Sequence, residues 1–335
     1  MDEIITLDYG SGGKKTSRLI ENEVLPRLGN PALGELGDGA VLRGEGELVF
    51  STDSFVVSPL FFPGGDIGKL AVCGTVNDIA MCGGEARYLS LALIIEEGLE
   101  RSALSRVLDS VQRAAEAARV QVVTGDTKVV ERGRGDGLYI NTAGIGFLRR
   151  AGLTPRAIRD GDAVLLSGTA GDHGAAVMLA RGGLIDDSSG AVKSDCAALG
   201  ALTGALFASG AEVRCLRDPT RGGVATTLCE FAESSGLGLE LEEAEIPVSP
   251  AVEAACSLLG LDPLYCANEG KLLCVVSAET AEAALGALRG HELGRSAAVI
   301  GHVSAAAAGR VLLRTRSGGA RVLQKLAGAQ LPRIC

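Results

Sequence analysis

The sequence predicts a mixed α/β (α+β) protein of two domains, on three observations. Short runs rich in β-branched and aromatic residues alternate along the chain with longer segments whose apolar residues recur at helical spacing. The chain has 335 residues, enough for about two domains of roughly 100 to 200 residues each. Hydrophobic residues make up 47% and charged residues 22% of it, proportions typical of a globular protein with a buried core.

In the first half, a strand is predicted over 47–58, which is rich in β-branched and aromatic residues. A helix is predicted over 68–81, because Leu70, Val76 and Ile79 fall at helical spacing before the pattern stops at two glycines. The same patterns then predict strands at 87–95, 121–130 and 138–148, and an Ala-rich amphipathic helix at 101–119.

A stretch with Gly, Pro and Arg at 150–162 interrupts this alternation, and we place the domain boundary there. The N-terminal domain is then 1–152 and the C-terminal domain is 153–324. In the second domain the patterns predict strands at 163–166 and 271–277 and near 297, 310 and 320, with helices near 173–182, 195–209, 222–235, 250–259 and 279–289.

Residues 325–335 show no usable period and are predicted to form a flexible tail that carries Cys335. Fully extended, these 11 residues reach about 35 Å at about 3.3 Å each, so the tail could enter a distant site. A thiol in such a place is either incidental or a chemical handle. A neighbouring carboxylate should raise the pKa of this thiol, and Arg333 is expected to offset part of that effect.

Net charge and cysteine spacing exclude several classes of protein. A net charge of −9 argues against broad binding to nucleic acid or to an anionic membrane. Neither a signal sequence nor an apolar run of about 18 residues is present, which favours a cytoplasmic protein. The nine cysteines contain no C-x-x-C pair, so zinc and disulfide frameworks are disfavoured. Apart from Cys335, the cysteines are expected to be small buried hydrophobes.

Five aspartates lie at the ends of apolar segments beside small residues, and these are Asp38, Asp53, Asp78, Asp126 and Asp218. Carboxylates that converge from several strand ends suit Mg²⁺, which takes one or two carboxylates together with water and substrate phosphates. Lys128 and Arg221 would then face the phosphates. Each aspartate taken singly is also a common turn or helix-cap residue.

Three further features of the sequence bear on possible chemistry. Residues 10–16 resemble a phosphate-binding P-loop, but the first glycine and the final spacing are missing, so we reject that motif. Glu269 precedes an apolar strand and could be a general base, which needs a carboxylate within reach of the proton it removes. Asp172, at the start of a predicted helix, is expected to cap that helix.

Several segments carry distinctive motifs, and these are Phe50-Ser-Thr-Asp-Ser-Phe-Val-Val, Cys73-Gly-Thr-Val-Asn-Asp-Ile-Ala, Val122-Val-Thr-Gly-Asp-Thr-Lys-Val-Val, Ser167-Gly-Thr-Ala-Gly-Asp-His-Gly, Arg217-Asp-Pro-Thr-Arg-Gly-Gly, Asn268-Glu-Gly-Lys and Pro332-Arg-Ile-Cys. Together they resemble the HypE family of NiFe-hydrogenase maturation proteins, in the superfamily of aminoimidazole ribonucleotide synthetase and selenophosphate synthetase. The resemblance is colinear over essentially the whole chain.

The resemblance implies a homodimer whose N-terminal domains form a shared β-barrel, with ATP bound in a cleft beside it. It also implies that the carbamoyltransferase HypF loads a carbamoyl group onto Cys335. ATP would then drive dehydration of S-carbamoyl-Cys335 to S-cyano-Cys335, and the cyanide would pass to iron on the HypC–HypD complex.

Site roles follow from the same resemblance, with ATP and Mg²⁺ as cofactors. Cys335 would carry the reacting group, Glu269 would remove a proton, and Lys128 and Asp78 would complete the catalytic set. The residues assigned to ATP are Asp38, Asp53, Asp126, Lys128, Asn141, Thr142 and Arg221. The residues assigned to the metal are Asp38, Asp53, Asp78, Asp126 and Asp218. A single aspartate in Gly37-Asp38-Gly39, where the superfamily often has two, leaves the number of metal ions open.

Three alternatives remain at this stage. A selenophosphate synthetase would use a free substrate, but its reactive Cys or selenocysteine is absent from the glycine-rich loop at 9–14. A non-catalytic scaffold would leave Cys335 incidental and would not bind Mg-ATP. A sulfur carrier would hold a persulfide on Cys335 and need no ATP.

Overall fold

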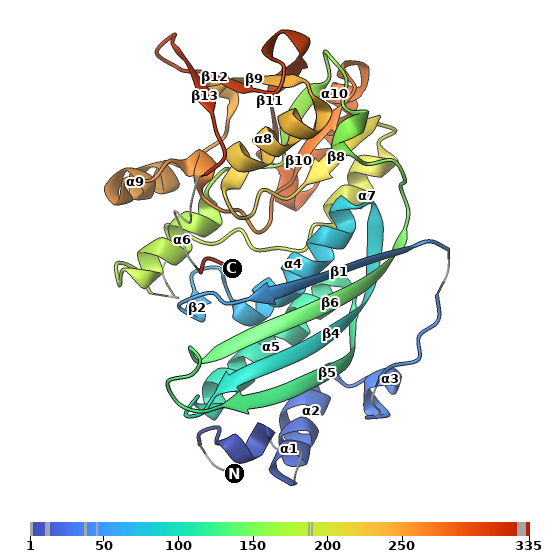
Figure 1. Cartoon of the computed structure of the whole chain (residues 1–335), viewed down its shortest axis with the longest axis vertical. Helices are drawn as coiled ribbons and strands as arrows, with labels where there is room; N and C mark the ends of the chain where they lie inside the picture. The colour runs from blue at the N-terminus through green and yellow to red at the C-terminus, as the bar shows by residue number, and fades with distance from the viewer. Residues whose placement is uncertain are drawn as a thin grey trace.

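The protein is built around two β-sheets, one in each half of the chain (Figure 1). The computed structural model describes residues 3–10, 14–36, 39–44, 46–186, 188, 190–326 and 333–335. Within these residues, one sheet has four strands in the order β1-β6-β4-β5, and the other has seven in the order β13-β12-β9-β11-β7-β10-β8. Helices pack on both sheets, which confirms the mixed α/β class.

Two helices pack on one face of the four-stranded sheet. Its strands are β1 (Leu48–Phe55), β4 (Gly84–Glu96), β5 (Gln121–Val130) and β6 (Leu138–Leu148), and only β4 and β5 run parallel to each other. The covering helices are α4 (Ile67–Met81) and α5 (Arg101–Ala118), and a small hairpin of β2 (Phe61–Phe62) and β3 (Gly65–Asp66) precedes α4. Short helical turns come before the sheet, namely η1 (Leu7–Gly10), α1 (Lys14–Leu19), η2 (Ile20–Val24), α2 (Leu25–Leu28) and α3 (Pro31–Gly34).

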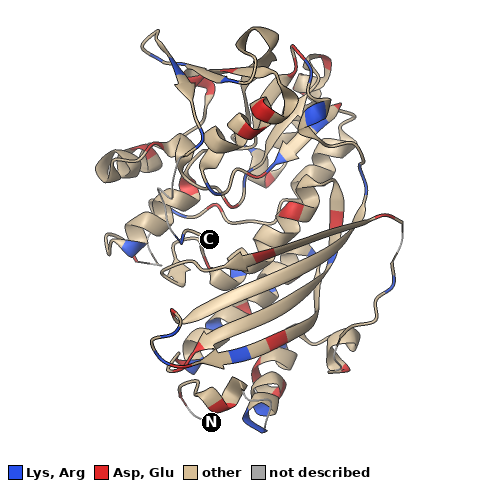
Figure 2. Cartoon of the chain, viewed as in Figure 1, with Lys and Arg blue, Asp and Glu red and all other residues tan. Residues whose placement is uncertain are grey.

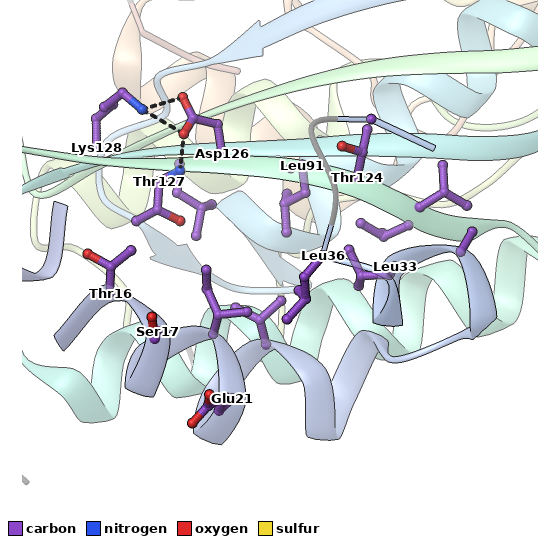
Figure 3. Close-up of a pocket in the computed structure, with 18 of the residues that line it drawn as sticks. Thr16, Ser17, Glu21, Leu33, Leu36, Leu91, Thr124, Asp126, Thr127 and Lys128 are labelled. Atoms are coloured by element: carbon purple, nitrogen blue, oxygen red, sulfur yellow. Dashed lines mark hydrogen bonds and ion pairs between the residues drawn. The ribbon is translucent and has the colours of Figure 1, made fainter. Parts of the chain in front are cut away.

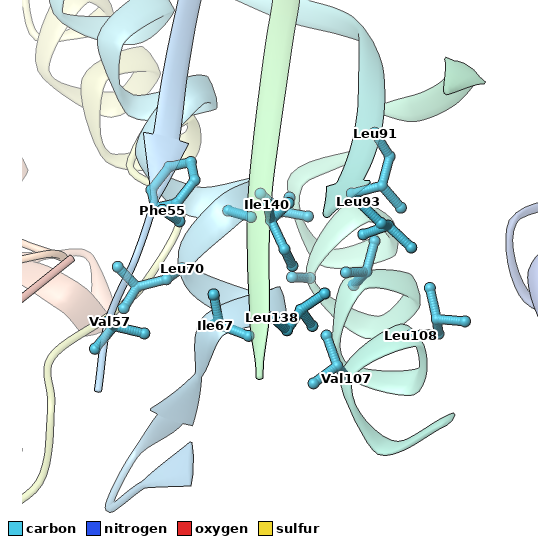
Figure 4. Close-up of a cluster of buried hydrophobic side chains, with 14 of the residues drawn as sticks. Phe55, Val57, Ile67, Leu70, Leu91, Leu93, Val107, Leu108, Leu138 and Ile140 are labelled. Carbon is cyan, nitrogen blue, oxygen red and sulfur yellow. The ribbon is translucent and has the colours of Figure 1, made fainter. Parts of the chain in front are cut away.

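The core of this half lies between the sheet and its two helices (Figure 4). Phe55, Ile140 and Leu93 from the strands meet Leu70 of α4 and Val107 of α5, and all of them are buried. Nearly every residue of α4 is buried, because the helix is apolar on all sides and is covered by the sheet, by α5 and by the second half of the chain.

The second sheet carries the remaining elements. Its strands are β7 (Ala163–Leu166), β8 (Val213–Arg217), β9 (Gly238–Glu242), β10 (Leu273–Val276), β11 (Ala298–Ser304), β12 (Val311–Arg314) and β13 (Ala320–Leu323). Its α-helices are α6 (Asp172–Arg181), α7 (Gly200–Ala208), α8 (Gly223–Ser235), α9 (Pro250–Leu259) and α10 (Ala281–Arg289). The 3₁₀ turns are η3 (Pro155–Ala157), η4 (Glu243–Glu245), η5 (Pro263–Tyr265), η6 (Ala278–Thr280), η7 (Glu292–Gly294) and η8 (Ala305–Ala307).

The structure departs from the sequence prediction in a few elements. Strands β8 and β9 were not predicted, because each has five residues and β9 alternates leucine with glutamate, a residue depleted in strands. The helix predicted from 195 begins only at Gly200, since residues 190–199 form an irregular connection without helix or strand. Cys82 is exposed, unlike the other seven cysteines predicted to be buried with it. Among the described residues, no helix is long and apolar enough to cross a membrane.

A buried carboxylate ties the N-terminal turns to α5. The Glu23 carboxylate accepts hydrogen bonds from Arg101 Nε (2.7 Å), Ser105 Oγ (2.7 Å) and Arg27 Nη1 (2.9 Å). Burial would by itself raise the pKa of Glu23. The hydrogen bonds from Ser105 and Arg101 and the two guanidinium charges outweigh burial, so the pKa lies below its ordinary value.

Glu23→Gln should therefore lower the free energy of unfolding by about 2 kcal/mol near neutral pH, because it removes the carboxylate charge from the partly buried Arg101 and Arg27, of which Arg27 keeps Asp109 as a second partner. A pKa that is lower in the folded state contributes stability that is present above the unfolded pKa and is lost as pH falls through the folded pKa. Urea unfolding of both proteins at neutral pH and at about pH 3 measures this, and the difference should shrink in acid. An equal difference at both pH values would mean that the ion pairs are not its cause.

Candidate active site

A polar cavity of about 420 Å³ lies between the two halves of the chain. Strand β1 and helix α4 form one wall, and the turn after β8 together with the loop before β10 forms the other. The described end of the chain reaches the same place, between β1, α4 and α6 (Figure 1). The lining residues are Thr52, Asp53, Gly74, Asp78, Arg217, Asp218, Thr220, Arg221, Thr227, Glu230, Glu269 and Cys335.

Two of the predicted carboxylates come from the N-terminal half. Asp53 lies on β1, and its neighbour Ser51 donates a hydrogen bond to Asp78 Oδ2 on α4 (2.7 Å). Burial raises the pKa of Asp78, and the charge of Asp53 raises it further, although Ser51 lowers it. Gly74 is required beside them, since a Cβ at this position would lie 2.8 Å from the Phe55 ring.

The turn between β8 and α8 supplies Asp218 and Arg221. Gly222 and Gly223 both have positive φ (81° and 62°), and a Cβ on Gly223 would meet the Leu264 carbonyl oxygen at 2.5 Å, so the glycines allow this tight approach. Asp218 is buried, and burial together with the charge of Asp78 raises its pKa to about 7.

Glu269 faces the cavity from the loop before β10. Its side chain is 2% exposed, and Oε1 is buried without a hydrogen-bond partner among the described residues. Burial raises the pKa of Glu269 well above its ordinary value, and the charge of Asp218 adds to this. A buried carboxylate oxygen without a partner is costly, which marks Glu269 as a residue that serves a ligand or a reaction.

The end of the chain is docked in this cavity. The Val56 amide donates to the terminal carboxylate of Cys335 (3.2 Å) and the Ser58 amide to the Arg333 carbonyl oxygen (3.3 Å), so residues 333–335 run beside the segment that follows β1. Arg181 donates to both the Ser58 and the Arg333 carbonyl oxygens (2.8 and 2.6 Å). Cys335 is buried, and it is the only cysteine in the cavity lining.

The charges around Cys335 differ from those expected. Burial is the main cause that raises the pKa of its thiol, followed by the charge of Glu269, whereas a hydrogen bond from Arg221 lowers it. The expected counter-charge, Arg333, instead pairs with Asp136 and donates to the Val56 carbonyl oxygen (3.2 Å). Arg333 therefore anchors the tail, and Arg221 is the cation that faces the thiol.

Four other predicted site residues lie away from the cavity. Asp126 and Lys128 on β5 pair with each other at a separate pocket of about 400 Å³, against the N-terminal turns (Figure 3). Asn141 donates to the Asp53 carbonyl oxygen (2.9 Å) from the opposite face of the sheet. Thr142 is buried, with Oγ1 bonded to Thr75 Oγ1 (2.6 Å) and the Ala71 carbonyl oxygen (3.0 Å). Asp38 lies outside the described residues.

The strand register fixes the separation of these residues. Asp126 lies opposite Ala92, which lies opposite Asn141, whereas Asp53 lies opposite Thr142. Asp126 is therefore three strands from β1, about 14 Å at about 4.8 Å per strand, and on the other face from Asp53. Within one chain, Asp126 and Lys128 do not share a site with Asp53.

Sequence reasoning overlooked Arg217 and Glu230. Their side chains pair across the cavity wall at 3.8 Å, one at the end of β8 and the other on α8. The available signal was the position of Arg217 directly before Asp218, but β8 was not predicted, so its end was not recognised. Asp172 also differs from expectation, because it pairs with Lys271 (3.3 Å) and does not cap α6.

The donor set of the cavity fits a hard cation bound together with phosphates. Three aspartates, Asp53, Asp78 and Asp218, line it together with two glutamates and two guanidinium groups, and acidic and basic residues border the chain end in Figure 2. Over the described ranges, no group of three or more ligands is already arranged around a metal position. The aspartates and arginines of the lining suit Mg²⁺ bound with phosphates, because Mg²⁺ is usually held by one or two carboxylates and completed by substrate phosphates and water.

The two halves of the chain match a known pair of domains. Residues 36–148 match the N-terminal domain of AIR synthase related proteins, and residues 159–314 match the C-terminal domain of the same proteins. This pairing defines a two-domain protein of the AIR synthase related class, with the two sheets in its two parts.

Individual relatives show to which family of this class the chain belongs. "Carbamoyl dehydratase HypE" of Cupriavidus necator is 49% identical over 334 residues, which cover 99% of this chain and 95% of the relative. The crystal structure of a HypE in complex with ATP has a TM-score of 0.94 at 49% identity, over 98% of this chain and 99% of that one. The structure of a HypE–HypF complex has a TM-score of 0.79 at 44% identity, over 92% and 99%. The chain belongs to the HypE family, as its motifs predicted.

The buried thiol allows a direct test of the docked tail. Cys335 should react with iodoacetamide more slowly than the exposed Cys82 near neutral pH, because its thiol is shielded. Burial raises the pKa of both thiols, so the accessibility of the sulfur is the main difference between them. The rate should rise with pH as the thiolate fraction grows. Peptide mass spectrometry after timed labelling measures both rates, and faster labelling of Cys335 than of Cys82 would contradict the docked position.

Proposed function

We propose that this chain is an ATP-dependent carbamoyl dehydratase that converts S-carbamoyl-Cys335 to S-cyano-Cys335. The observation that carries the proposal is the arrangement of one cavity, where the Cys335 thiol shares its lining with the buried, unpartnered carboxylate of Glu269 and with three aspartates. The names of the HypE relatives and the ATP-bound structure of one of them support it. A non-catalytic scaffold would have no use for so costly a group of buried carboxylates.

The reaction removes the elements of water from the carbamoyl group. The carbamoyl oxygen attacks a phosphorus of ATP, and the phosphoanhydride bond to the leaving nucleotide breaks. Loss of the N–H protons then allows the carbon–nitrogen bond to become triple while the carbon–oxygen bond breaks and the oxygen leaves as phosphate. Phosphorylation turns a poor leaving group into a good one, and the sulfur–carbon bond is never broken.

Glu269 is the group that takes a proton from the carbamoyl nitrogen. It lines the same cavity as Cys335, and its Oε1 is free to accept a hydrogen bond. The raised pKa makes this carboxylate a stronger base than an exposed one, because a general base works best when its pKa lies near the operating pH.

The phosphates of ATP would lie between the aspartates and the arginines. Asp53, Asp78 and Asp218, with Asp38 by resemblance, are the residues that would hold Mg²⁺, which neutralises charge on the transferred phosphoryl group. Arg221, and beside it Arg217, would offset the remaining phosphate charge. Arg221 also reaches the sulfur of Cys335, so it can orient the carbamoyl group.

We also propose a homodimer in which N-terminal domains (residues 1–152) form a shared β-barrel. The sheet face away from α4 and α5 exposes apolar side chains, with Phe50 67% and Leu48 62% exposed, and β1 and β5 are its two edge strands. A second copy could supply what one chain does not, because closing a barrel would bring its edge strand β5, with Asp126 and Lys128, beside the edge strand β1 that carries Asp53. Residues 153–324 would form the second domain and 325–335 the tail.

The proposed partners follow the path of the carbamoyl group. HypF would load Cys335, as the HypE–HypF complex of a relative suggests. The HypC–HypD complex would receive the cyanide for the iron of a NiFe-hydrogenase, with all steps in the cytoplasm. Each transfer requires Cys335 to leave the cavity, which would break the hydrogen bonds that residues 333–335 make with Val56, Ser58 and Arg181.

The first test concerns Glu269. Carbamoyl-loaded Glu269→Gln protein should lose water at least about 100-fold more slowly than wild type, because the amide cannot accept the proton. ATP affinity should stay within about threefold, since the substitution keeps the shape of the side chain. Intact-mass analysis with and without ATP measures the loss of one water. If the wild-type protein loses no water, or loses it without ATP, the proposed function fails.

The second test concerns the second copy. Asp78→Asn and Lys128→Ala proteins should each be inactive. An equal mixture of the two after subunit exchange should recover about a quarter of wild-type activity, because about half of its dimers are mixed and each of these has one intact site of two. If Lys128 serves the other copy, one site of each mixed dimer contains both native residues. No recovery after subunit exchange, checked by mass, would place both residues in the site of one chain.

A further inference from the structure

Residues 194–197, here called the strap, lie between α6 and α7 and contact both the tail and the Glu269 loop. Ser194 donates its amide to the Pro63 carbonyl oxygen (2.8 Å), and Gly64 packs so closely that a Cβ would lie 2.4 Å from the Ser194 carbonyl oxygen. The strap is therefore held in place beside the β2–β3 hairpin. Its contacts on the other side concern the proposed reaction.

On one side, the strap reaches the tail through His173. The imidazole is buried, with Nδ1 2.8 Å from Ser194 Oγ and Nε2 2.8 Å from the Ile334 carbonyl oxygen. A carbonyl oxygen only accepts, so Nε2 carries the proton and donates it. Burial lowers the pKa of His173, which keeps the ring neutral and makes Nδ1 an acceptor.

The direction of the remaining hydrogen bonds is then fixed. The Ser194 hydroxyl donates to His173 Nδ1, and Ser194 Oγ accepts from the Cys196 amide (3.1 Å). The Phe62 ring meets the imidazole edge-on, with 5.4 Å between the centroids. Backbone, hydroxyl, imidazole and tail carbonyl thus form one chain of hydrogen bonds that ends next to Cys335.

On the other side, the strap holds the backbone of Glu269. Asp195 accepts from the Glu269 amide through Oδ1 (3.1 Å) and from the Gly270 amide through Oδ2 (3.3 Å). Lys271 Nζ pairs with the same carboxylate (3.1 Å), whose side chain is 3% exposed. Gly270 is required here, because a Cβ would lie 1.9 Å from the Asp195 carbonyl oxygen. The Ala197 amide also donates to the Glu269 carbonyl oxygen (3.2 Å).

Adjacent residues of one short segment therefore hold both the tail that carries Cys335 and the loop that carries Glu269. We infer that the strap is a positioning element for the dehydration, in which Ser194 and His173 seat the tail while Asp195 seats Glu269, so that the two are brought together as a unit. This inference rests on the proposed function. His173, Ser194 and Asp195 are positioning residues, since they touch backbone groups and not the reacting atoms.

The first experiment measures tail docking in the unloaded protein, without ATP. His173→Asn shortens the donor so that it no longer reaches the Ile334 carbonyl, and Cys335 should be alkylated about tenfold faster, as expected for loss of one buried hydrogen bond. His173→Gln keeps an N–H near the position of Nε2 and should stay within about threefold of wild type. Ser194→Ala, a smaller change, should fall between them.

The second experiment measures single-turnover dehydration of the carbamoyl-loaded protein with ATP. His173→Asn and Asp195→Asn should each slow water loss by about tenfold or more, with ATP affinity unchanged. Because both act through one strap, the double variant should be slowed about as much as the more affected single variant. Asp162→Asn is the matched control, since Asp162 is buried and paired with Arg214 far from the strap, and should move neither readout.

The outcomes separate this inference from the proposed function. If the wild-type protein does not dehydrate its carbamoyl group, the proposed function fails, and the alkylation rates still test the docking contact. If the wild type dehydrates but His173→Asn matches it in both readouts, the inference is overturned. It is also overturned if the two single effects multiply in the double variant. If Cys335 is alkylated as fast in His173→Gln as in His173→Asn, the hydrogen bond from Nε2 does not seat the tail, and the role inferred for His173 is wrong.

Discussion

One buried amide holds the two halves of this protein in register. Asn77 is fully buried on α4, where its Nδ2 donates to the Ala197 carbonyl oxygen (3.0 Å) and its Oδ1 accepts from the Leu199 amide (2.8 Å). Its Nδ2 also lies 3.4 Å from the Glu269 carbonyl oxygen. An amide has both donors and an acceptor, so it can satisfy backbone groups of both kinds at one point. Asp78 is the next residue, and its distance from Glu269 is therefore set by this contact.

The cavity that results contains more carboxylates than guanidinium groups. Asp78, Asp218 and Glu269 each have a raised pKa, because burial removes water from them and the charge of at least one nearby carboxylate adds to this. Such a group costs stability unless a ligand brings positive charge. The fold tolerates this because the surrounding backbone is fixed by glycines and by paired amides. Because burial and mutual repulsion disfavour their charged forms, these carboxylates bind a cation or accept a proton more readily than exposed ones.

Much of the fold could be predicted from the sequence, because helix α5 and strands β5 and β6 have clear periodicity and sharp ends. Strand β9 could not, since its glutamates are explained only by its neighbours in the sheet. The site could be predicted only in part, because the sequence does not show which strands are neighbours. Asp53, Asp78, Asp218, Arg221, Glu269 and Cys335 meet in one cavity, but motifs carry no strand order, so they could not reveal that Asp126 lies three strands away. The strap carries no recognisable motif, and its role depends entirely on contacts made after folding.

The surroundings of the docked sulfur also favour the uncharged forms of the Cys335 side chain over the ionised thiolate. A free thiolate in this cavity would face Glu269 and Asp53 with little water, and the raised pKa expresses that penalty. A thiocarbamate or a thiocyanate has no net charge, so it escapes the repulsion. The same pocket therefore tolerates the loaded and the finished forms of the side chain better than the ionised empty one. It also keeps the unmodified sulfur in its protonated form, which is the form least open to oxidants and electrophiles.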